Sequence, residues 1–213
     1  MGKYIGAAVV LVALIGFAIL GGRYLLNKSS GGVTPIIPNT TTEVPVQVAT
    51  STYASSTLGF SVVYPKSYTV NDTYAYDQFG PKKLIHGVKF VIPSTMATGT
   101  NLSSNDTGVS IEQLPHAKKC TADIYMLQNV KAHTESFNGV EYSVASSSDA
   151  GAGNRYEETV HAFTSSIPCT ALRYFIHYGD INNYDASSSI KEFDRAALLK
   201  DFDVIRSSVV FTH

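Results

Sequence analysis

The sequence predicts an α+β fold: an antiparallel sheet of about seven strands covered by two or more helices, preceded by one transmembrane helix. Three observations predict it. Residues 5–20 are almost purely apolar, short β-rich runs follow one another from residue 58 onward, and a helical repeat of apolar residues occupies 189–206. Several strands with a separate helix are typical of α+β domains. We therefore divide the 213 residues into an anchor at 4–26, a linker at 27–56 and an extracytoplasmic domain at 57–213.

The anchor is the first element. No charged residue occurs from Tyr4 to Gly22, and nineteen helical residues span ~28 Å, close to the ~30 Å hydrocarbon core of a bilayer. A cleavable signal peptide is the alternative, with an apolar region of about 7–15 residues and a small-residue cleavage site. The run here is longer and continues as Gly-Gly-Arg-Tyr-Leu-Leu. We therefore favour an uncleaved membrane anchor.

The linker at 27–56 is rich in Ser, Thr, Pro, Gly and Val and shows no helical period. Pro35, Pro38 and Pro45 block a regular helix and favour an extended, polyproline-like chain. We expect a passive spacer that holds the domain away from the membrane.

The domain opens with short strands. The runs LGFSVVY (58–64) and LIHGVKFVI (84–92) are each followed by proline, which ends a strand because it cannot donate to the hydrogen-bond ladder. The run GVSIEQL (108–114) alternates, as a strand with one buried face does. All three runs are therefore predicted to be strands of the sheet.

Two hairpins are expected next. Asn138-Gly139 lies between strand-like runs within 132–145, and both residues tolerate the positive φ of a type I′ turn. A second hairpin is predicted from 155–163 and 169–178, joined by the loop 164–168. Its second strand alternates, with Leu172, Tyr174, Ile176 and Tyr178 on one face and Arg173, Phe175 and His177 on the other.

Two helices complete the domain. The apolar residues of 189–206 match the 3.6-residue repeat, and Ser189 with Glu192 forms a capping box that satisfies the first free amides. A shorter helix is expected over 121–128, and 207–211 is predicted to form a last short strand.

The two cysteines, Cys120 and Cys169, are too far apart for a CxxC redox or zinc motif. We expect a structural disulfide that joins the short helix to the sheet; a catalytic thiol or half of a metal site are the alternatives. Disulfides persist outside the cytosol. This pairing therefore favours an extracytoplasmic domain behind a single-pass anchor.

Charge and motifs exclude several classes of function. The 16 basic and 17 acidic residues leave a formal net charge of −1, whereas a nucleic-acid-binding domain shows a clearly basic face. No G-x-S-x-G, H-E-x-x-H or P-loop motif occurs. We expect no nucleic-acid partner, no cofactor, no metal and no recognisable catalytic set.

A polar face on the second hairpin is the candidate ligand or ion-pair site. It comprises Arg155, Glu157, Glu158, His161, Arg173 and His177. His161, His177 and Glu157 are expected on one face, where such a cluster can bind zinc or transfer protons, although solvated cross-strand pairs are commoner. One of the two glutamates must face inward, and Arg155 or Arg173 is its expected partner.

A patch of tyrosines lies nearby in the sequence, at positions 64, 68, 74 and 76. Buried tyrosines would belong to the core, which is the favoured interpretation. Exposed tyrosines would form a surface for a glycan or a protein, because tyrosine combines an apolar ring with a polar tip.

The segment Gly59-Phe60-Ser61-Val62-Val63-Tyr64-Pro65 resembles the opening strand of PsbP/Mog1-like α+β domains. The blocks at 150–162, 168–185 and 192–211 resemble uncharacterised small membrane-anchored proteins of candidate-phylum (Parcubacteria-type) bacteria. This resemblance covers most of residues 57–211 and implies a sandwich of helices and sheet in the cell envelope. It supplies no catalytic residues.

Two functional hypotheses follow. The first is a membrane-tethered, extracytoplasmic binding or scaffolding domain, whose partner is an envelope protein or a cell-surface ligand. The alternative is an extracytoplasmic hydrolase or metal-dependent enzyme that uses the His/Glu face of the sheet.

Overall fold

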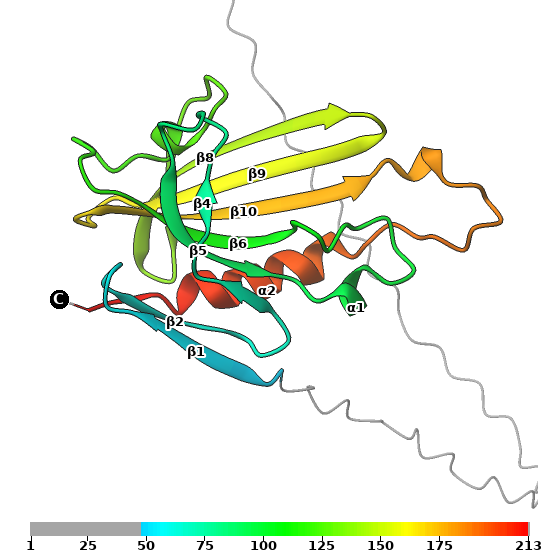
Figure 1. The fold of residues 1–213 in the computed structure, drawn as a ribbon, viewed down its shortest axis with the longest axis horizontal. Helices are drawn as coiled ribbons and strands as arrows, with labels where there is room; N and C mark the ends of the chain where they lie inside the picture. The colour runs from blue at the N-terminus through cyan, green and yellow to red at the C-terminus, as the bar shows by residue number, and fades with distance from the viewer. Residues whose placement is uncertain (1–47, 213) are drawn as a thin grey trace, which may run out of the picture. The chain divides into compact units, whose positions relative to one another are not determined.

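The computed structural model describes residues 48–212, whose fold is drawn in Figure 1. The predicted anchor and most of the predicted linker lie outside these residues. Within 48–212, no helix has both the length and the apolar character needed to cross a membrane.

Eight strands form the main sheet, and all paired strands in it are antiparallel. Their order is β3-β5-β6-β10-β9-β8-β7, and β4 pairs with β5. The strands are β3 (Thr69–Asn71), β4 (Ala75–Tyr76), β5 (Ile85–Val91), β6 (Gly108–Leu114), β7 (His133–Phe137), β8 (Val140–Gly151), β9 (Asn154–Phe163) and β10 (Cys169–Gly179). The predicted antiparallel sheet is thus confirmed, with eight strands instead of about seven.

A second, three-stranded sheet has the order β1-β2-β11. Its strands are β1 (Thr50–Ser55), β2 (Phe60–Pro65) and β11 (Val210–Phe211). β1 falls inside the stretch assigned to the linker, where Ser and Thr conceal its alternation. Its Tyr53 ring packs against Phe60 and Phe90, with ring centroids 6.3 and 5.9 Å away. The folded domain therefore includes residues 50–56, ahead of the predicted boundary at 57.

Both predicted hairpins are confirmed. Asn138 and Gly139 have φ of 50° and 79°, as the type I′ turn between β7 and β8 requires. A third turn, at Ala152 and Gly153 with φ of 50° and 81°, joins β8 to β9. This turn explains why β8 continues to Gly151, well beyond the predicted end at residue 145.

The long helix α2 (Arg195–Ser207) begins six residues later than predicted. Its N-cap is Asp194, whose carboxylate accepts a 2.9 Å hydrogen bond from the backbone N–H of Ala197. The predicted capping box at Ser189 and Glu192 is therefore wrong.

Backbone bonds to a distant loop explain the late start of α2. The N–H of Asn101 donates to the carbonyl of Lys191 at 2.9 Å, and the N–H of Lys191 donates to the carbonyl of Gly99 at 3.0 Å. These bonds hold the residues before α2 in an extended form that a helix excludes. Other helical elements are short: α1 (Ser94–Ala97), η2 (Ile181–Asn183) and η1 (Ala122–Tyr125), which is a 3₁₀ turn within the predicted 121–128 helix.

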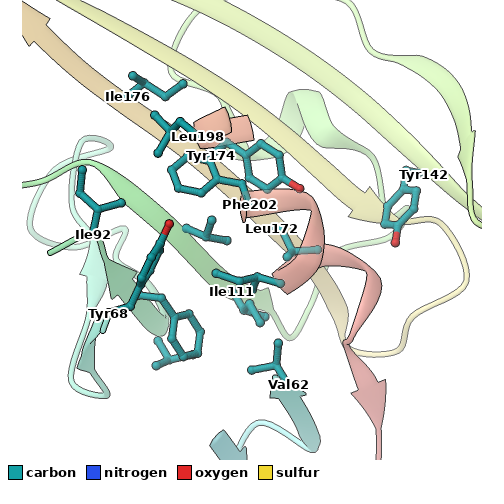
Figure 2. Close-up of a cluster of buried hydrophobic side chains, with 14 of the residues drawn as sticks. Val62, Tyr68, Ile92, Ile111, Tyr142, Leu172, Tyr174, Ile176, Leu198 and Phe202 are labelled. Carbon is teal, nitrogen blue, oxygen red and sulfur yellow. The ribbon is translucent and has the colours of Figure 1, made fainter. Parts of the chain in front are cut away.

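The main core lies where α2 packs between the two sheets (Figure 1). Leu198, Phe202 and Ile205 of α2 are at most 1% exposed, and Figure 2 shows α2 side chains beside Leu172 and Tyr174 of β10. Ala197 of the predicted apolar stripe is exposed instead. The buried face of α2 is therefore narrower than the predicted stripe.

A second, smaller core covers part of the opposite face of the main sheet. There Ala122 and Tyr125 of η1 pack with Val160 and Ala171 of the sheet. The predicted disulfide is confirmed: Cys120, just before η1, is bonded to Cys169 at the start of β10, with a Cα–Cα distance of 5.0 Å. The η1 segment is therefore fastened to one end of this face and leaves the rest of it open.

Candidate ligand-binding site

The face of the main sheet opposite α2 carries a cavity of about 460 Å³, within the ~300–1,000 Å³ usual for small-molecule sites. Its floor follows the strand register, which puts Lys89 of β5, Arg173 and Phe175 of β10, Glu158 of β9 and Ser147 of β8 on one face of the sheet. The residues around β4 form one wall, and residues 127–128 after η1 contribute another.

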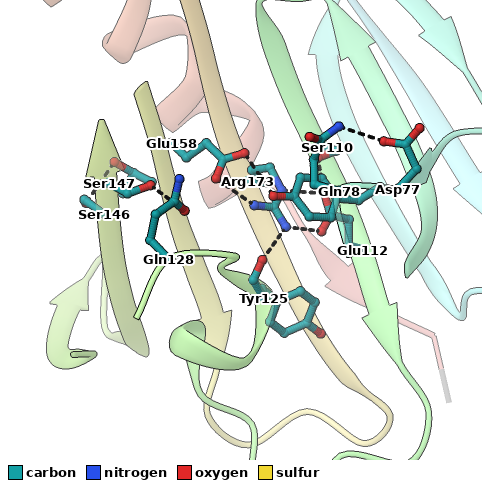
Figure 3. A network of polar contacts seen from close by, with 12 residues as sticks. Asp77, Gln78, Ser110, Glu112, Tyr125, Gln128, Ser146, Ser147, Glu158 and Arg173 are labelled. Carbon is teal, nitrogen blue, oxygen red and sulfur yellow. Dashed lines mark hydrogen bonds and ion pairs between the residues drawn. The ribbon is translucent and has the colours of Figure 1, made fainter. Parts of the chain in front are cut away.

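Arg173 occupies the centre of the floor, and its side chain is only 2% exposed. Its Nε and Nη2 donate to the two carboxylate oxygens of Glu112 at 2.9 and 2.8 Å, and Nη2 also donates to the carbonyl of Tyr125 at 2.9 Å (Figure 3). The Tyr76 ring centroid lies 3.6 Å from the guanidinium carbon. Bidentate pairing and ring contact together hold the guanidinium group in one orientation.

Glu158 extends this network toward the cavity. Its Oε2 lies 3.4 Å from Nη1 of Arg173, a buried nitrogen that has no hydrogen bond, and its Oε1 accepts one from the Tyr76 hydroxyl at 3.3 Å. Burial raises the pKa of Glu158, and the charge of Arg173 opposes this shift. The predicted inward glutamate is thus Glu158, and its arginine partner is Arg173. The sequence analysis did not identify Glu112, which is the closer partner of Arg173.

Lys89 lies at the other side of the floor. Its Nζ is 5.1 Å from the ring centroid of Phe175 and 5.5 Å from that of Tyr74, so the ammonium group contacts two ring faces. Burial lowers the pKa of Lys89, and the charges of Asp106 and Glu112 oppose this shift. Sequence patterns did not identify this lysine, because one polar residue inside an apolar strand commonly faces solvent.

The six predicted site residues divide between the two faces of the sheet. Tyr156 pairs with His177 and Val160 with Arg173, so Glu158, Arg173 and His177 share the cavity face. The other three, Arg155, Glu157 and His161, point to the α2 side. The expectation that His161, His177 and Glu157 share one face is therefore wrong.

The pairing register causes this separation. A shift of one residue in the register exchanges the faces of a strand, and the loop between β9 and β10 sets a register that the sequence alone did not specify. Within residues 48–212, no three His, Cys, Asp or Glu side chains are grouped as ligands for a metal ion. The proposed zinc or acid–base cluster is not formed from these residues.

The residues on the α2 side have separate partners. Glu157 pairs with Arg195 of α2 and accepts a 2.7 Å hydrogen bond from the Tyr178 hydroxyl. Arg155 forms a 2.7 Å ion pair with Asp180, which directly follows β10. Each contact ties β9 to a neighbouring segment.

The two histidines also lie in different surroundings. His161 is 5% exposed, and burial followed by the charge of Arg206 lowers its pKa to about 3. His177 bonds through Nδ1 to Asp106 at 2.8 Å and through Nε2 to Asn154 at 3.0 Å. His161 is thus a neutral core residue, and His177 braces the rim of the cavity through Asp106.

The tyrosine patch serves both of the expected roles. Tyr68 and Tyr76 are buried, as expected for core residues, and Tyr64 is half-buried against the main core. Tyr74 and Tyr76 also line the cavity, where their hydroxyls donate to Glu112 and Glu158. The patch therefore contributes to the core and to the candidate site.

Comparisons with known proteins give distant structural similarities. No protein-family model matches the sequence, and no curated protein matches it. The fold is similar to that of cyanobacterial PsbP (CyanoP) from Synechocystis sp. PCC 6803, with a TM-score of 0.43 and 13% identity over 79% of this chain and 96% of CyanoP. It is also similar to a Bacteroides thetaiotaomicron protein, with a TM-score of 0.41 and 10% identity over 76% of this chain. The chain spans 48% of that second protein, and neither similarity assigns a function.

Proposed function

We propose that this chain is an extracytoplasmic binding domain of the cell envelope, tethered to the membrane by residues 4–26, and that its ligand occupies the cavity on the open sheet face. One observation carries the proposal: a cavity of about 460 Å³ lined by aromatic rings and by charged groups of both signs. Pockets with convergent polar groups and perturbed pKa values are typical of ligand sites.

The cellular location in this proposal has its own support. The Cys120–Cys169 disulfide is compatible with an oxidising compartment, and the apolar run at 5–20 has the length of a bilayer-spanning helix. We also propose that the chain is related to PsbP/Mog1-like domains and to the envelope proteins of candidate-phylum bacteria, because its sequence resembles both.

Acylation of Lys89 provides the test. The purified full-length chain is treated with acetic anhydride in the presence and absence of a solubilised envelope extract, and modification of each lysine is measured by mass spectrometry. We expect the extract to reduce modification of Lys89, which lines the cavity, and not that of the exposed Lys200. Equal modification of Lys89 in both conditions would contradict the proposal.

A matched pair of variants identifies the cavity as the protected site. Ser147 lines the cavity, whereas Ser148, the next residue of β8, faces the opposite side of the sheet. Ser147→Trp places an indole in the cavity and should abolish the protection that the extract gives to Lys89. Ser148→Trp adds the same bulk elsewhere and should preserve it.

A further inference from the structure

The apolar part of the cavity lining is aromatic rather than aliphatic. Tyr74, Tyr156 and Phe175 are half-buried, so their rings remain partly accessible, while Ala75 and Leu127 are the aliphatic residues of the lining. Flat rings suit a ligand that has a flat apolar face and polar edges. An acyl chain would instead require an aliphatic tunnel.

The position of the Tyr156 ring is fixed by its neighbours. Its ring stacks on His177 with centroids 4.5 Å apart, and both ring nitrogens of His177 are bonded, to Asp106 and to Asn154. The stacked His177 ring therefore holds the Tyr156 ring in place without a ligand. A rigid aromatic surface loses little conformational entropy on binding.

The lining carries charges of both signs: the cations Lys89 and Arg173, and the carboxylates Asp77, Asp106, Asp149 and Glu158. Lys89 provides N–H donors that lie against the rings of Phe175 and Tyr74, and Glu158 and Asp149 provide carboxylate acceptors, while Nη1 of Arg173 is buried behind Glu158. A ligand with one net charge would be attracted to one set and repelled by the other. A hydroxyl group both donates and accepts hydrogen bonds, so a ligand with several hydroxyls matches both sets.

We propose that the cavity binds a neutral sugar, with a pyranose ring stacked on Tyr156 and Phe175 and its hydroxyls bonded to Lys89 and Glu158. This inference rests on the proposed function and names its ligand class. The cavity of about 460 Å³ fits a short saccharide rather than a polymer chain, since sites of this size enclose small molecules.

Saturation-transfer NMR on the full-length chain tests the proposal, in a detergent without a sugar headgroup. The probes are glucose, galactose, mannose and N-acetylglucosamine, each at millimolar concentration. We expect saturation transfer to at least one sugar, and at least a tenfold loss of affinity in Tyr156→Leu and Phe175→Leu. Tyr156→Phe keeps the ring and should keep binding, and Tyr184→Leu, an exposed ring outside the cavity, should also keep it.

Two results would overturn the sugar assignment. One is the absence of saturation transfer to all four sugars. The other is sugar binding that survives both leucine substitutions in the cavity. Glycine betaine and glutamate are included as cationic and anionic probes, and binding of either in place of the sugars would refute the ligand class while Lys89 protection still supported a ligand site. Failure of the proposed function itself would appear as Lys89 modification that the extract leaves unchanged.

Discussion

Arg173 shows how a single residue ties stability to the candidate site. Glu112, its bidentate partner, is 1% exposed, so removal of the guanidinium leaves a buried carboxylate without its main charge partner. We predict that Arg173→Met lowers the free energy of unfolding by about 3–5 kcal/mol, measured by urea denaturation. The double variant Arg173→Met/Glu112→Gln should cost less than the sum of the two single changes, and a loss below about 1 kcal/mol in Arg173→Met would contradict the buried pair.

His161 makes the second prediction at this scale. Its pKa is about 3 in the folded protein, against about 6.5 in an unfolded chain, so between these values the unfolded chain binds the extra proton. Stability must therefore fall as the pH drops from about 6.5 toward 3, by at most about 1.4 kcal/mol per pH unit. His161→Gln should make the plot of unfolding free energy against pH flatter in this window. An unchanged slope would show that His161 is not buried as a neutral group.

Among the elements, α2 depends on one cap. The Asp194 carboxylate accepts a hydrogen bond from Ala197 at the start of the helix, whereas Glu192 is exposed and lies before it. We predict that Asp194→Ala lowers the melting temperature, at a cost of about 1 kcal/mol. Glu192→Ala should change stability by less than about 0.5 kcal/mol. A larger loss of stability in Glu192→Ala than in Asp194→Ala would contradict the cap at Asp194 and support the predicted capping box.

Local patterns predicted the elements more completely than the site. The strands at 84–92 and 108–114, the Asn138-Gly139 turn and the second hairpin are confirmed because each depends on short-range periodicity or turn chemistry. The start of α2 was wrong because distant backbone bonds to Gly99 and Asn101 override a local cap. β1 was missed because its Ser and Thr content resembles that of a spacer.

The site shows the same division between local and distant causes. Alternation in 155–158 predicted that one glutamate faces inward with Arg155 or Arg173 as its partner, and the structure pairs Glu158 with Arg173. Glu112 and Lys89 were missed because the alternation of each strand, taken alone, predicts that polar residues face solvent. In the folded chain, Tyr74, Tyr76 and η1 cover that face. A sequence signal did exist, since the tyrosine patch precedes β5, but its position over the sheet is a property of the whole fold.

For the molecule as a whole, the disulfide joins the two sides of the smaller core. Cys120 and Cys169 are 49 residues apart, and closing a loop of this length stabilises a fold by about 4 kcal/mol on the chain-entropy model. We predict that Cys120→Ala/Cys169→Ala lowers the free energy of unfolding by about 2–4 kcal/mol, measured by urea denaturation without reductant. A loss below about 1 kcal/mol would show that packing alone holds the η1 segment on the sheet.

The most direct test of the central claim is lysine labelling of intact cells with a membrane-impermeant acylating reagent. We predict that Lys200 is labelled without lysis, because the domain lies outside the cytoplasm. We also predict that Lys89 is labelled less in cells than in the purified chain, because a ligand fills the cavity. Labelling of Lys200 only after lysis, or equal labelling of Lys89 in both preparations, would contradict an extracytoplasmic binding domain with its ligand on the open face of the sheet.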